Sequence, residues 1–330
     1  MSIDISNITI MVTGGAGYIG SVLVRQLLNA GYRVKVVDML RSGGESLLDI
    51  AQHPNFSFFR FDIRDKNSIA PIIKDCWAVV HLAAIVGDPA CKAEPELAVS
   101  INQTGAQQLY ELAEEAKCER FVFASTCSNY GKMPDPSSYV CETSELSPVS
   151  LYAQTKVGFE QYLLNQSRSN ACKPTCLRFS TVYGFSPRTR FDLTVNEFTK
   201  ELCLERELVV FGEQFWRPYC HVDDLARSIG LVLSSQLDAT EFEVFNVGDT
   251  AENYTKQMIV NEILKQLPNS KIKYVPKNED PRDYRVDFSK IKNKLNFNIT
   301  KRVPDGIAEI IRLINMGLIS NPDDKKYYNT

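Results

Sequence analysis

The sequence predicts an α/β protein built on a Rossmann-type doubly wound parallel sheet, followed by a smaller C-terminal α/β region. Two observations carry this prediction. Short, nearly continuous apolar runs alternate with amphipathic segments over the first two-thirds of the chain, and a cluster of glycines directly follows the first run. The 330 residues are 44% hydrophobic and 23% charged, which is an ordinary composition for a globular protein.

Six apolar runs are predicted to be strands of the main sheet. Strands without polar alternation are covered on both faces, as in a parallel sheet. Three amphipathic segments lie between them and predict helices, so the β-α-β order implies right-handed crossovers. The strands are expected at 8–13, 33–38, 56–62, 77–84, 120–125 and 175–183, and the helices at 21–30, 95–117 and 151–167.

The pattern loosens after residue 183. No Gly/Ser-rich linker separates the two halves, so the second half is expected to pack against the first. We predict a Rossmann domain over 1–183 and a substrate-binding region over 184–330, some of whose segments return to the first domain. Further elements are expected as helices at 191–206, 223–234, 256–267 and 304–316, a strand at 208–211, a turn at 280–283 and a loose polar tail at 321–330.

Charge and cysteine content exclude several classes of function. The chain has 37 basic and 40 acidic residues, and this balance offers no footprint for nucleic acid. No apolar run approaches the ~18 residues of a membrane span, so no membrane partner is expected. Nine cysteines and three histidines lack metal-site spacing, so we expect reduced thiols, a cytoplasmic location and no metal.

A dinucleotide site is predicted at the first strand. Gly14, Gly17 and Gly20 follow that strand and open a helix, where they permit a tight turn and let backbone N–H groups approach a pyrophosphate. Asp38 ends the second predicted strand and suits the hydroxyls of the adenosine ribose. Because a carboxylate there repels a 2′-phosphate, NAD is the predicted cofactor. Nearby Arg41 could accommodate that phosphate, so NADP is not excluded.

A proton-transfer group is predicted on the helix at 151–167. Tyr152 and Lys156 are four residues apart and therefore share one helix face. A free tyrosine has a pKa of about 10, and an adjacent cation, aided by a positive nicotinamide ring, favours the phenolate that abstracts a proton. Thr126 follows the fifth strand, at the edge where an open α/β sheet binds its ligand. We therefore predict Thr126, Tyr152 and Lys156 as catalytic residues, the alternative for the Tyr/Lys pair being an ordinary solvated surface.

Further motifs lie along nearly the whole chain: 13–20 (TGGAGYIG), 62–65 (DIRD), 81–84 (HLAA), 125–131 (STCSNYG), 177–179 (LRF) and 217–224 (RPYCHVDD). Together with Asn102 and the Tyr/Lys pair, they resemble the NAD-dependent sugar-nucleotide epimerase/dehydratase family. This is the UDP-galactose 4-epimerase-like branch of the extended short-chain dehydrogenases/reductases. The resemblance implies an enzyme that uses NAD, binds a nucleoside-diphosphate sugar and forms a homodimer.

The resemblance also implies roles for individual residues. Asp62 and Ile63 are expected to contact adenine, Ala83 and Ala84 to line the ribose and phosphate path, and Arg217 to bind a diphosphate. The implied cofactor-binding set is Gly14, Gly17, Tyr18, Ile19, Gly20, Asp38, Asp62, Ile63, Leu82, Ala83, Ala84, Asn102, Ser125, Tyr152, Lys156, Phe179 and Val182. The implied substrate-binding set is Thr126, Thr181, Arg190, Asn196, Arg217 and Arg282.

Two departures from the family pattern bear on the reaction. Sugar-nucleotide 4,6-dehydratases carry Asp and Glu after the catalytic threonine, whereas Cys127 and Ser128 stand here, and neither is an acid–base group at neutral pH. Thr181 stands where the family often has an asparagine that binds the sugar nucleotide. Dehydration is therefore disfavoured, and a direct transfer of the family's UDP-hexose pocket is weakened.

The leading hypothesis is NAD-dependent oxidation of the C4 hydroxyl of a nucleoside-diphosphate sugar, by a 4-dehydrogenase or a 4-epimerase. Segments 186–192 and 282–287 resemble a subgroup of bacterial surface-polysaccharide and capsule enzymes, for which a GDP-heptose is one candidate substrate. One alternative is an NAD(P)H-dependent reductase of a 4-keto sugar nucleotide. An alternative of another class is a non-catalytic NAD-binding regulator, which the presence of both Tyr152 and Lys156 disfavours.

Overall fold

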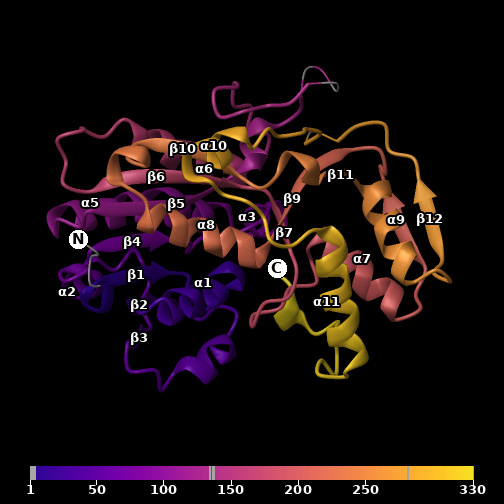
Figure 1. The fold of residues 1–330 in the computed structure, drawn as a ribbon, viewed down its shortest axis with the longest axis horizontal. Coiled ribbons are helices and arrows are strands. Elements are labelled where there is room, and N and C mark those ends of the chain that lie inside the picture. Colours follow the sequence, from indigo (N-terminus) through magenta and orange to yellow (C-terminus); the bar gives the residue numbers. More distant parts are fainter. Residues whose placement is uncertain (1–4, 134, 136–137, 281, 330) are drawn as a thin grey trace.

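A seven-stranded parallel sheet forms the centre of the computed structural model, which describes residues 5–133, 135, 138–280 and 282–329 (Figure 1). The strand order is that of a doubly wound Rossmann sheet, and it confirms the predicted fold class. Across the sheet the strands are β10 (Glu243–Val247), β6 (Lys173–Phe179), β5 (Arg120–Thr126), β4 (Ala78–His81), β1 (Thr9–Thr13), β2 (Arg33–Val37) and β3 (Phe56–Phe59).

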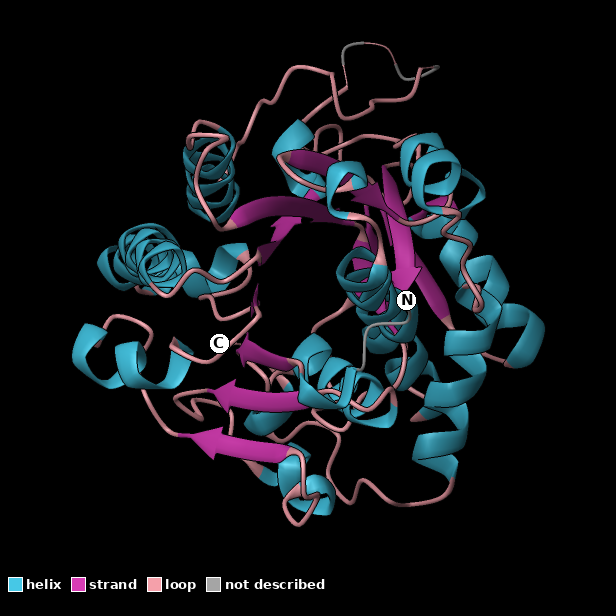
Figure 2. Ribbon diagram, turned by 60° about the vertical axis from the view of Figure 1, so that its left-hand side comes forward, coloured by secondary structure: helices cyan, strands magenta, loops and turns pink. Residues whose placement is uncertain are grey.

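Helices cover both faces of this sheet (Figure 2). Side chains alternate between the two faces along each strand, so Ile10 and Val12 of β1 join one buried core while Met11 joins the other. The first core is completed by α1 (Tyr18–Asn29), α8 (Val222–Ser234) and α10 (Ser289–Leu295). The second is completed by α2 (Lys66–Ile73), α5 (Ala106–Glu115) and α6 (Leu151–Leu164).

A smaller group of elements from the second half of the chain lies beside the carboxyl ends of the main strands, at the right of Figure 1. Three helices and two short sheets share a separate apolar core there. The sheets consist of β7 (Thr181–Tyr183), β9 (Trp216–His221) and β11 (Asn253–Thr255), and of β8 (Leu208–Phe211) with β12 (Ile272–Val275). The helices are α7 (Thr194–Cys203), α9 (Lys256–Gln266) and α11 (Val303–Asn315).

The structure divides two of the predicted elements. The strand expected at 175–183 breaks at Ser180, whose hydroxyl donates to the Val247 carbonyl (2.6 Å), so β6 stays in the main sheet while β7 joins β9. The helix expected at 95–117 consists of α4 (Pro95–Val99), a π-helical turn (Ser100–Gly105) and α5. Such turns accommodate an extra residue and occur often at functional sites.

The second half of the chain also supplies parts of the main sheet. Strand β10 pairs with β6, and α8 packs on α1. Segments β10, α8 and α10 of the second half thus pack on the Rossmann sheet. The boundary between the two domains at residue 183 stays a prediction. The short α3 (Asp88–Ala93) was not predicted. Of the turn predicted at 280–283, residue 281 lies outside the described residues.

Candidate active site

A cleft of about 670 Å³ opens at the carboxyl ends of the main strands, where the strand order reverses between the paired strands β1 and β4. Open α/β sheets bind their ligands at such a switch point, because the loops on the two sides run in opposite directions. The wall of the cleft combines the glycine turn, the ends of β2, β4, β5 and β6, the loop after β7 and the tail residues Lys325, Lys326, Tyr328 and Asn329.

The glycine turn has the shape of a phosphate cradle. Gly14 adopts a φ of +75°, and a Cβ on it would lie 2.7 Å from the Ala83 backbone nitrogen. A Cβ on Gly20 would overlap the Gly14 carbonyl oxygen, so only glycine allows this turn to pack so closely. Gly17 caps α1, whose first backbone N–H groups therefore line the cleft. This geometry fits the diphosphate of NAD, which binds at a helix N-terminus.

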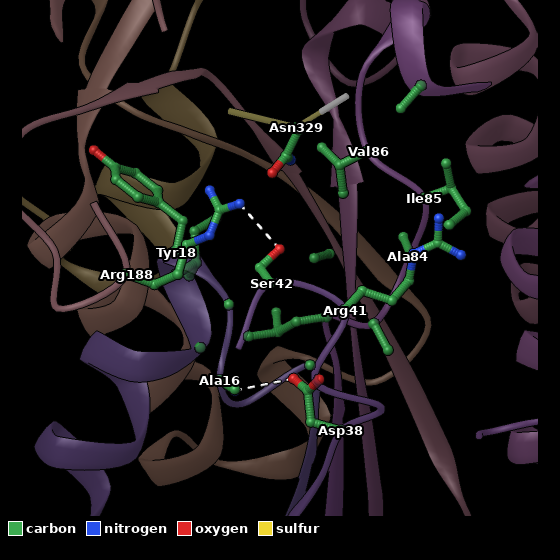
Figure 3. Close-up of a pocket in the computed structure, with 18 of the residues that line it drawn as sticks. Ala16, Tyr18, Asp38, Arg41, Ser42, Ala84, Ile85, Val86, Arg188 and Asn329 are labelled. Atoms are coloured by element: carbon green, nitrogen blue, oxygen red, sulfur yellow. Dashed lines mark hydrogen bonds between the residues drawn. The ribbon is translucent and has the colours of Figure 1, made fainter. Parts of the chain in front are cut away.

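Asp38 lies directly after β2 and faces the glycine turn (Figure 3). Its carboxylate accepts hydrogen bonds from the backbone N–H groups of Ala16 (3.0 Å) and Leu40 (2.8 Å). Burial raises the pKa of Asp38, and these two bonds oppose the rise. Arg41, the cation that kept NADP from being excluded, forms an ion pair with Glu94 (2.6 Å).

Lys156 of α6 is buried in the floor of the cleft, with 3% of its surface exposed. Its ammonium donates to the Ala124 carbonyl (2.8 Å) and lies 4.7 Å from the centre of the Phe123 ring. The centre of the Tyr152 ring is 5.9 Å from the same nitrogen. Burial lowers the pKa of Lys156 to about 8 because it removes water from the charged form.

We expected the Lys156 ammonium to lower the pKa of Tyr152. In the structure, the protein groups together do not lower it. Burial raises the pKa of Tyr152, and the charge that opposes this rise comes from Arg190. The ammonium of Lys156 points to the Ala124 carbonyl and is itself desolvated. The protein groups therefore do not by themselves favour the phenolate of Tyr152, and the nicotinamide ring is the other cation that was expected to favour it.

Thr126 ends β5 beside Tyr152 in the cleft wall. Its hydroxyl oxygen accepts a hydrogen bond from the Ser128 N–H (3.1 Å), which leaves its own proton available for a ligand. The preceding Ser125 donates to Glu160 (2.6 Å), and Glu160 forms a buried ion pair with Arg178 (2.6 Å). This network behind the strand holds the end of β5 in place.

Nearly all of the predicted cofactor residues line the cleft, as do Thr126 and Arg190 of the predicted substrate set. Asn102 does not. Its side chain forms two hydrogen bonds with the Ile85 backbone (2.8 and 2.9 Å) and one with Thr155 (3.4 Å). It therefore joins the loop after β4 to helix α6, next to Tyr152 and Lys156, and acts on the cleft by positioning.

Asn196 also lies outside the cleft wall and is fully buried. Its side-chain amide accepts from the Gly184 N–H (2.9 Å) and donates to the Arg190 carbonyl (2.9 Å) and the Tyr18 hydroxyl (3.1 Å). These bonds use its polar groups within the protein, so the structure gives it the role of holding the loop after β7. Thr181 of β7 likewise does not line the cleft.

Two predicted substrate ligands, Arg217 (predicted to bind the diphosphate) and Arg282, lie outside the cleft wall as well. Arg217 pairs with Asp280 (3.0 Å), and Arg282 pairs with Asp88 (2.8 Å). Arg190, which does line the cleft, pairs with Asp192 (2.6 Å). Each predicted substrate arginine thus has a carboxylate partner that a phosphate would have to replace.

One cluster away from the cleft has metal-ligand composition. His221, Asp223 and Glu309 lie close enough to share an ion, but the Lys301 ammonium contacts both carboxylates and supplies the positive charge there. His221 also caps α8 by accepting from the Asp223 N–H (3.1 Å). The ion pairs with Lys301 and the cap on α8 therefore explain why these three side chains lie together. Among the described residues, no helix is long and apolar enough to cross a membrane.

The predictions missed several parts of the cleft, among them Ser42, Arg188 and the tail. The tail was expected to be loose, and this was wrong for its described part. The Tyr328 hydroxyl accepts from Lys200 (2.8 Å), and the Tyr327 carbonyl accepts from the Phe191 N–H (2.9 Å). The polar composition of the tail gave no sign of these contacts. Arg188 could have been found from the sequence, because it lies two residues before the predicted Arg190.

A doubly wound sheet, a glycine cradle above its switch point and a Tyr/Lys pair in the same cleft define a dinucleotide-dependent oxidoreductase. Comparison with known proteins agrees. The profile of the NAD dependent epimerase/dehydratase family matches residues 10–248. The chain therefore belongs to this family, and it is an NAD-dependent enzyme.

Relatives extend over almost the whole chain. A UDP-glucuronate 4-epimerase of Thermodesulfobacterium geofontis is 30% identical over 313 residues, which span 91% of this chain and 94% of that protein. A dTDP-glucose 4,6-dehydratase of an Actinoplanes species is 31% identical and covers 92% of this chain and 96% of its own. The chain is thus similar to enzymes of two different reactions.

Solved structures show the same fold. The UDP-glucose 4-epimerase of Thermotoga maritima with UDP-glucose has a TM-score of 0.84 at 29% identity, covering 94% of this chain and 100% of that one. The UDP-glucuronic acid 4-epimerase of Bacillus cereus, in complex with UDP-glucuronic acid and NAD, has a TM-score of 0.83 at 27% identity. It covers 94% of this chain and 99% of its own.

Proposed function

We propose that this protein oxidises the C4 hydroxyl of a nucleoside-diphosphate sugar to a 4-keto sugar, as a 4-dehydrogenase or a 4-epimerase. The observation that carries the proposal is the placement of Thr126, Tyr152 and Lys156 in one cleft with the glycine cradle. Similarity to a structure that contains UDP-glucuronic acid and NAD supports the substrate class. When bound, NAD supplies the hydride acceptor.

The chain's own residues manage the proton. Thr126 donates a hydrogen bond to the substrate hydroxyl, because its oxygen is already engaged by the Ser128 N–H. Tyr152 as phenolate takes the hydroxyl proton while the C4–H bond breaks and its electron pair leaves as hydride. Lys156, which is buried and hydrogen-bonded to a fixed carbonyl, keeps a positive charge beside the reacting groups. Holding the reacting carbons in register is the fold's main contribution.

The two positions after Thr126 argue against dehydration. Cys127 is 1% exposed, its thiol lies against the Arg178 carbonyl (3.2 Å), and burial raises its pKa. Ser128 has no ionisable group near neutral pH. The cleft therefore lacks the acid–base pair at these positions that loss of water across C5 and C6 requires.

The finer parts of the proposal rest on the family resemblance. Arg190, Arg217 and Arg282 are the proposed ligands of the substrate, each exchanging a carboxylate for a phosphate oxygen. The resemblance of segments 186–192 and 282–287 to bacterial surface-polysaccharide enzymes favours a sugar of such a polysaccharide, with a GDP-heptose as the first to test. We propose a cytoplasmic homodimer on the same resemblance.

The test is incubation of the protein with UDP-, dTDP- and GDP-linked sugars, with C4 followed by NMR and the nicotinamide by absorbance. A new C4 epimer with oxidised cofactor identifies an epimerase, and a 4-keto sugar with reduced cofactor identifies a dehydrogenase. Tyr152→Phe abolishes both signals, while Tyr162→Phe on the same helix, outside the cleft wall, retains them. Substantial turnover by Tyr152→Phe contradicts the proposal.

A further inference from the structure

The loop between β7 and α7, residues 184–193, joins the second half of the chain to the cofactor side of the cleft. Ser186 donates a hydrogen bond to the Tyr18 carbonyl (2.7 Å), and the Tyr18 hydroxyl donates to the Gly184 carbonyl. Tyr18 begins α1, the helix whose N-terminus forms the glycine cradle. The loop is therefore fixed against the element that faces the phosphates of the dinucleotide.

Arg188 extends from this loop into the cleft wall, although only 7% of its surface is exposed. Its Nη2 donates to the Ser42 hydroxyl (3.0 Å) and to the Tyr328 carbonyl (3.4 Å). Figure 3 shows the guanidinium above Ser42, between Tyr18 and Asn329. Its Nη1 is buried and has no hydrogen-bond partner among the described residues. This side chain thus offers an unused donor at the cleft.

The charge of Arg188 is also unpaired. Within the described part of the chain, no carboxylate lies within 4.0 Å of its guanidinium, in contrast to other arginines in or near the cleft. Burial and the neighbouring charge of Arg190 lower the pKa of Arg188 to about 10. A buried guanidinium without a counter-ion is costly, and an anionic oxygen relieves that cost. The paired arginines are Arg41 with Glu94, Arg190 with Asp192, Arg217 with Asp280 and Arg282 with Asp88.

The described end of the tail lines the same cleft as Arg188. Lys200 of α7 holds Tyr328 by its hydroxyl and Asp323 by its carboxylate (3.0 Å), so the tail is fastened to the second region. Lys325 and Lys326 line the cleft together with Arg188. These three cationic residues from the second half of the chain thus line the cleft.

We propose that Arg188 is a diphosphate-binding residue of the dinucleotide site, supplied by the C-terminal region and oriented by Ser42 and the Tyr328 carbonyl. A diphosphate occurs in both the cofactor and the proposed substrate. We assign Arg188 to the cofactor because Ser42 lies four residues beyond Asp38, on the loop after β2. The inference rests on the NAD site and is independent of the proposed sugar chemistry.

The test measures binding without turnover. The full chain, freed of dinucleotide, is titrated calorimetrically with ADP-ribose, which carries the cofactor's diphosphate, and with UDP, which carries the substrate's. Arg188→Met is expected to weaken ADP-ribose binding by ~10-fold or more, as loss of a charge-assisted hydrogen bond implies, and to leave UDP binding within twofold. Arg33→Met, which removes an exposed arginine at the opposite end of β2, should change neither.

A merely structural role for Arg188 predicts a different pattern. In that case Arg188→Met lowers the urea midpoint of the dinucleotide-free protein, whereas removal of an unpaired buried charge leaves it equal or higher. If Arg188→Met does not fold, the same titrations are made with Arg188→Gln. This variant removes the charge but keeps a hydrogen-bond donor for Ser42. ADP-ribose affinity within twofold of wild type in the folded variant, or equal weakening of UDP, overturns the proposal.

Discussion

Replacement of Lys156 by methionine is expected to stabilise the protein near neutral pH while it abolishes activity. Burial lowers the pKa of this lysine from its usual 10.5 to about 8, which corresponds to a cost of about 3 kcal/mol for keeping the charge in the folded state. The methionine lacks that cost. It also loses the hydrogen bond to the Ala124 carbonyl, worth about 1–2 kcal/mol, so a net gain of about 1–2 kcal/mol remains.

The sign of the pH dependence follows from the depressed pKa. Between about pH 8 and pH 10.5 the unfolded chain holds a proton on this lysine that the folded chain has released, so wild-type stability rises with pH. The methionine variant has no such rise at this position. The variant's advantage in free energy of unfolding should therefore shrink above about pH 8 and reverse between about pH 9 and pH 10. Above about pH 10.5 only the lost hydrogen bond remains.

Urea unfolding of dinucleotide-free wild type and Lys156→Met, at neutral pH and at about pH 10, measures this difference. Absorbance of each preparation confirms that no nucleotide is bound, since cofactor binding would add its own stabilisation. A variant that is less stable than wild type by the same amount at both pH values would refute the reasoning. The lysine would then be charged at little cost, and the buried placement would not explain its behaviour.

Three further predictions concern the site. Tyr152→Phe should lower turnover by ~10²-fold or more, the scale of general-base catalysis, with NAD content of the purified protein unchanged; loss of the NAD would contradict its assigned role. Gly17→Asp should abolish bound NAD without unfolding, because a Cβ at this helix cap lies 3.1 Å from the Gly14 carbonyl and a carboxylate repels phosphate; circular dichroism and nucleotide absorbance report both. Glu160→Gln should cost about 3–5 kcal/mol by stranding the buried charge of Arg178, whereas Glu160→Leu with Arg178→Met should cost clearly less; similar urea midpoints for the two variants would contradict this.

The parts of the site that could be predicted depend on spacing along a single element. The glycines, Asp38 and the Tyr152/Lys156 pair are separated by distances that one strand, one turn or one helix determines. When they occur together, they are typical of a dinucleotide-binding enzyme. Local rules were therefore enough to single out residues that the structure brings together in one cleft.

The residues that could not be predicted depend on partners far along the chain. Asn196 lies on the expected helix, but its amide is used by Gly184, Arg190 and Tyr18, which no periodicity relates to it. Arg188 reaches the cleft because Tyr328, 140 residues later, lies beside it. Contacts of this kind are set by tertiary packing and leave no pattern in the sequence.

The prediction of one continuous strand over 175–183 was wrong for a related reason. Its apolar character is continuous, yet Ser180 bonds to the Val247 carbonyl of β10 and turns the chain out of the main sheet. Strand β10 itself lies in a part of the chain where no strand was expected. Which strands pair is determined by the whole fold, whereas apolar runs indicate only that a strand is present.

The central claim is that this cleft takes a hydride from C4 of a sugar nucleotide under control of Tyr152. The most direct measurement is a single turnover with a sugar nucleotide deuterated at C4, followed by mass spectrometry of the released nicotinamide cofactor and of the sugar product. With wild type, we expect the deuterium on the reduced cofactor if the enzyme is a dehydrogenase, or retained at C4 of the epimeric product if it is an epimerase. With Tyr152→Phe, we expect neither labelled product. Deuterium that exchanges into water while the cofactor stays unlabelled would contradict the central claim.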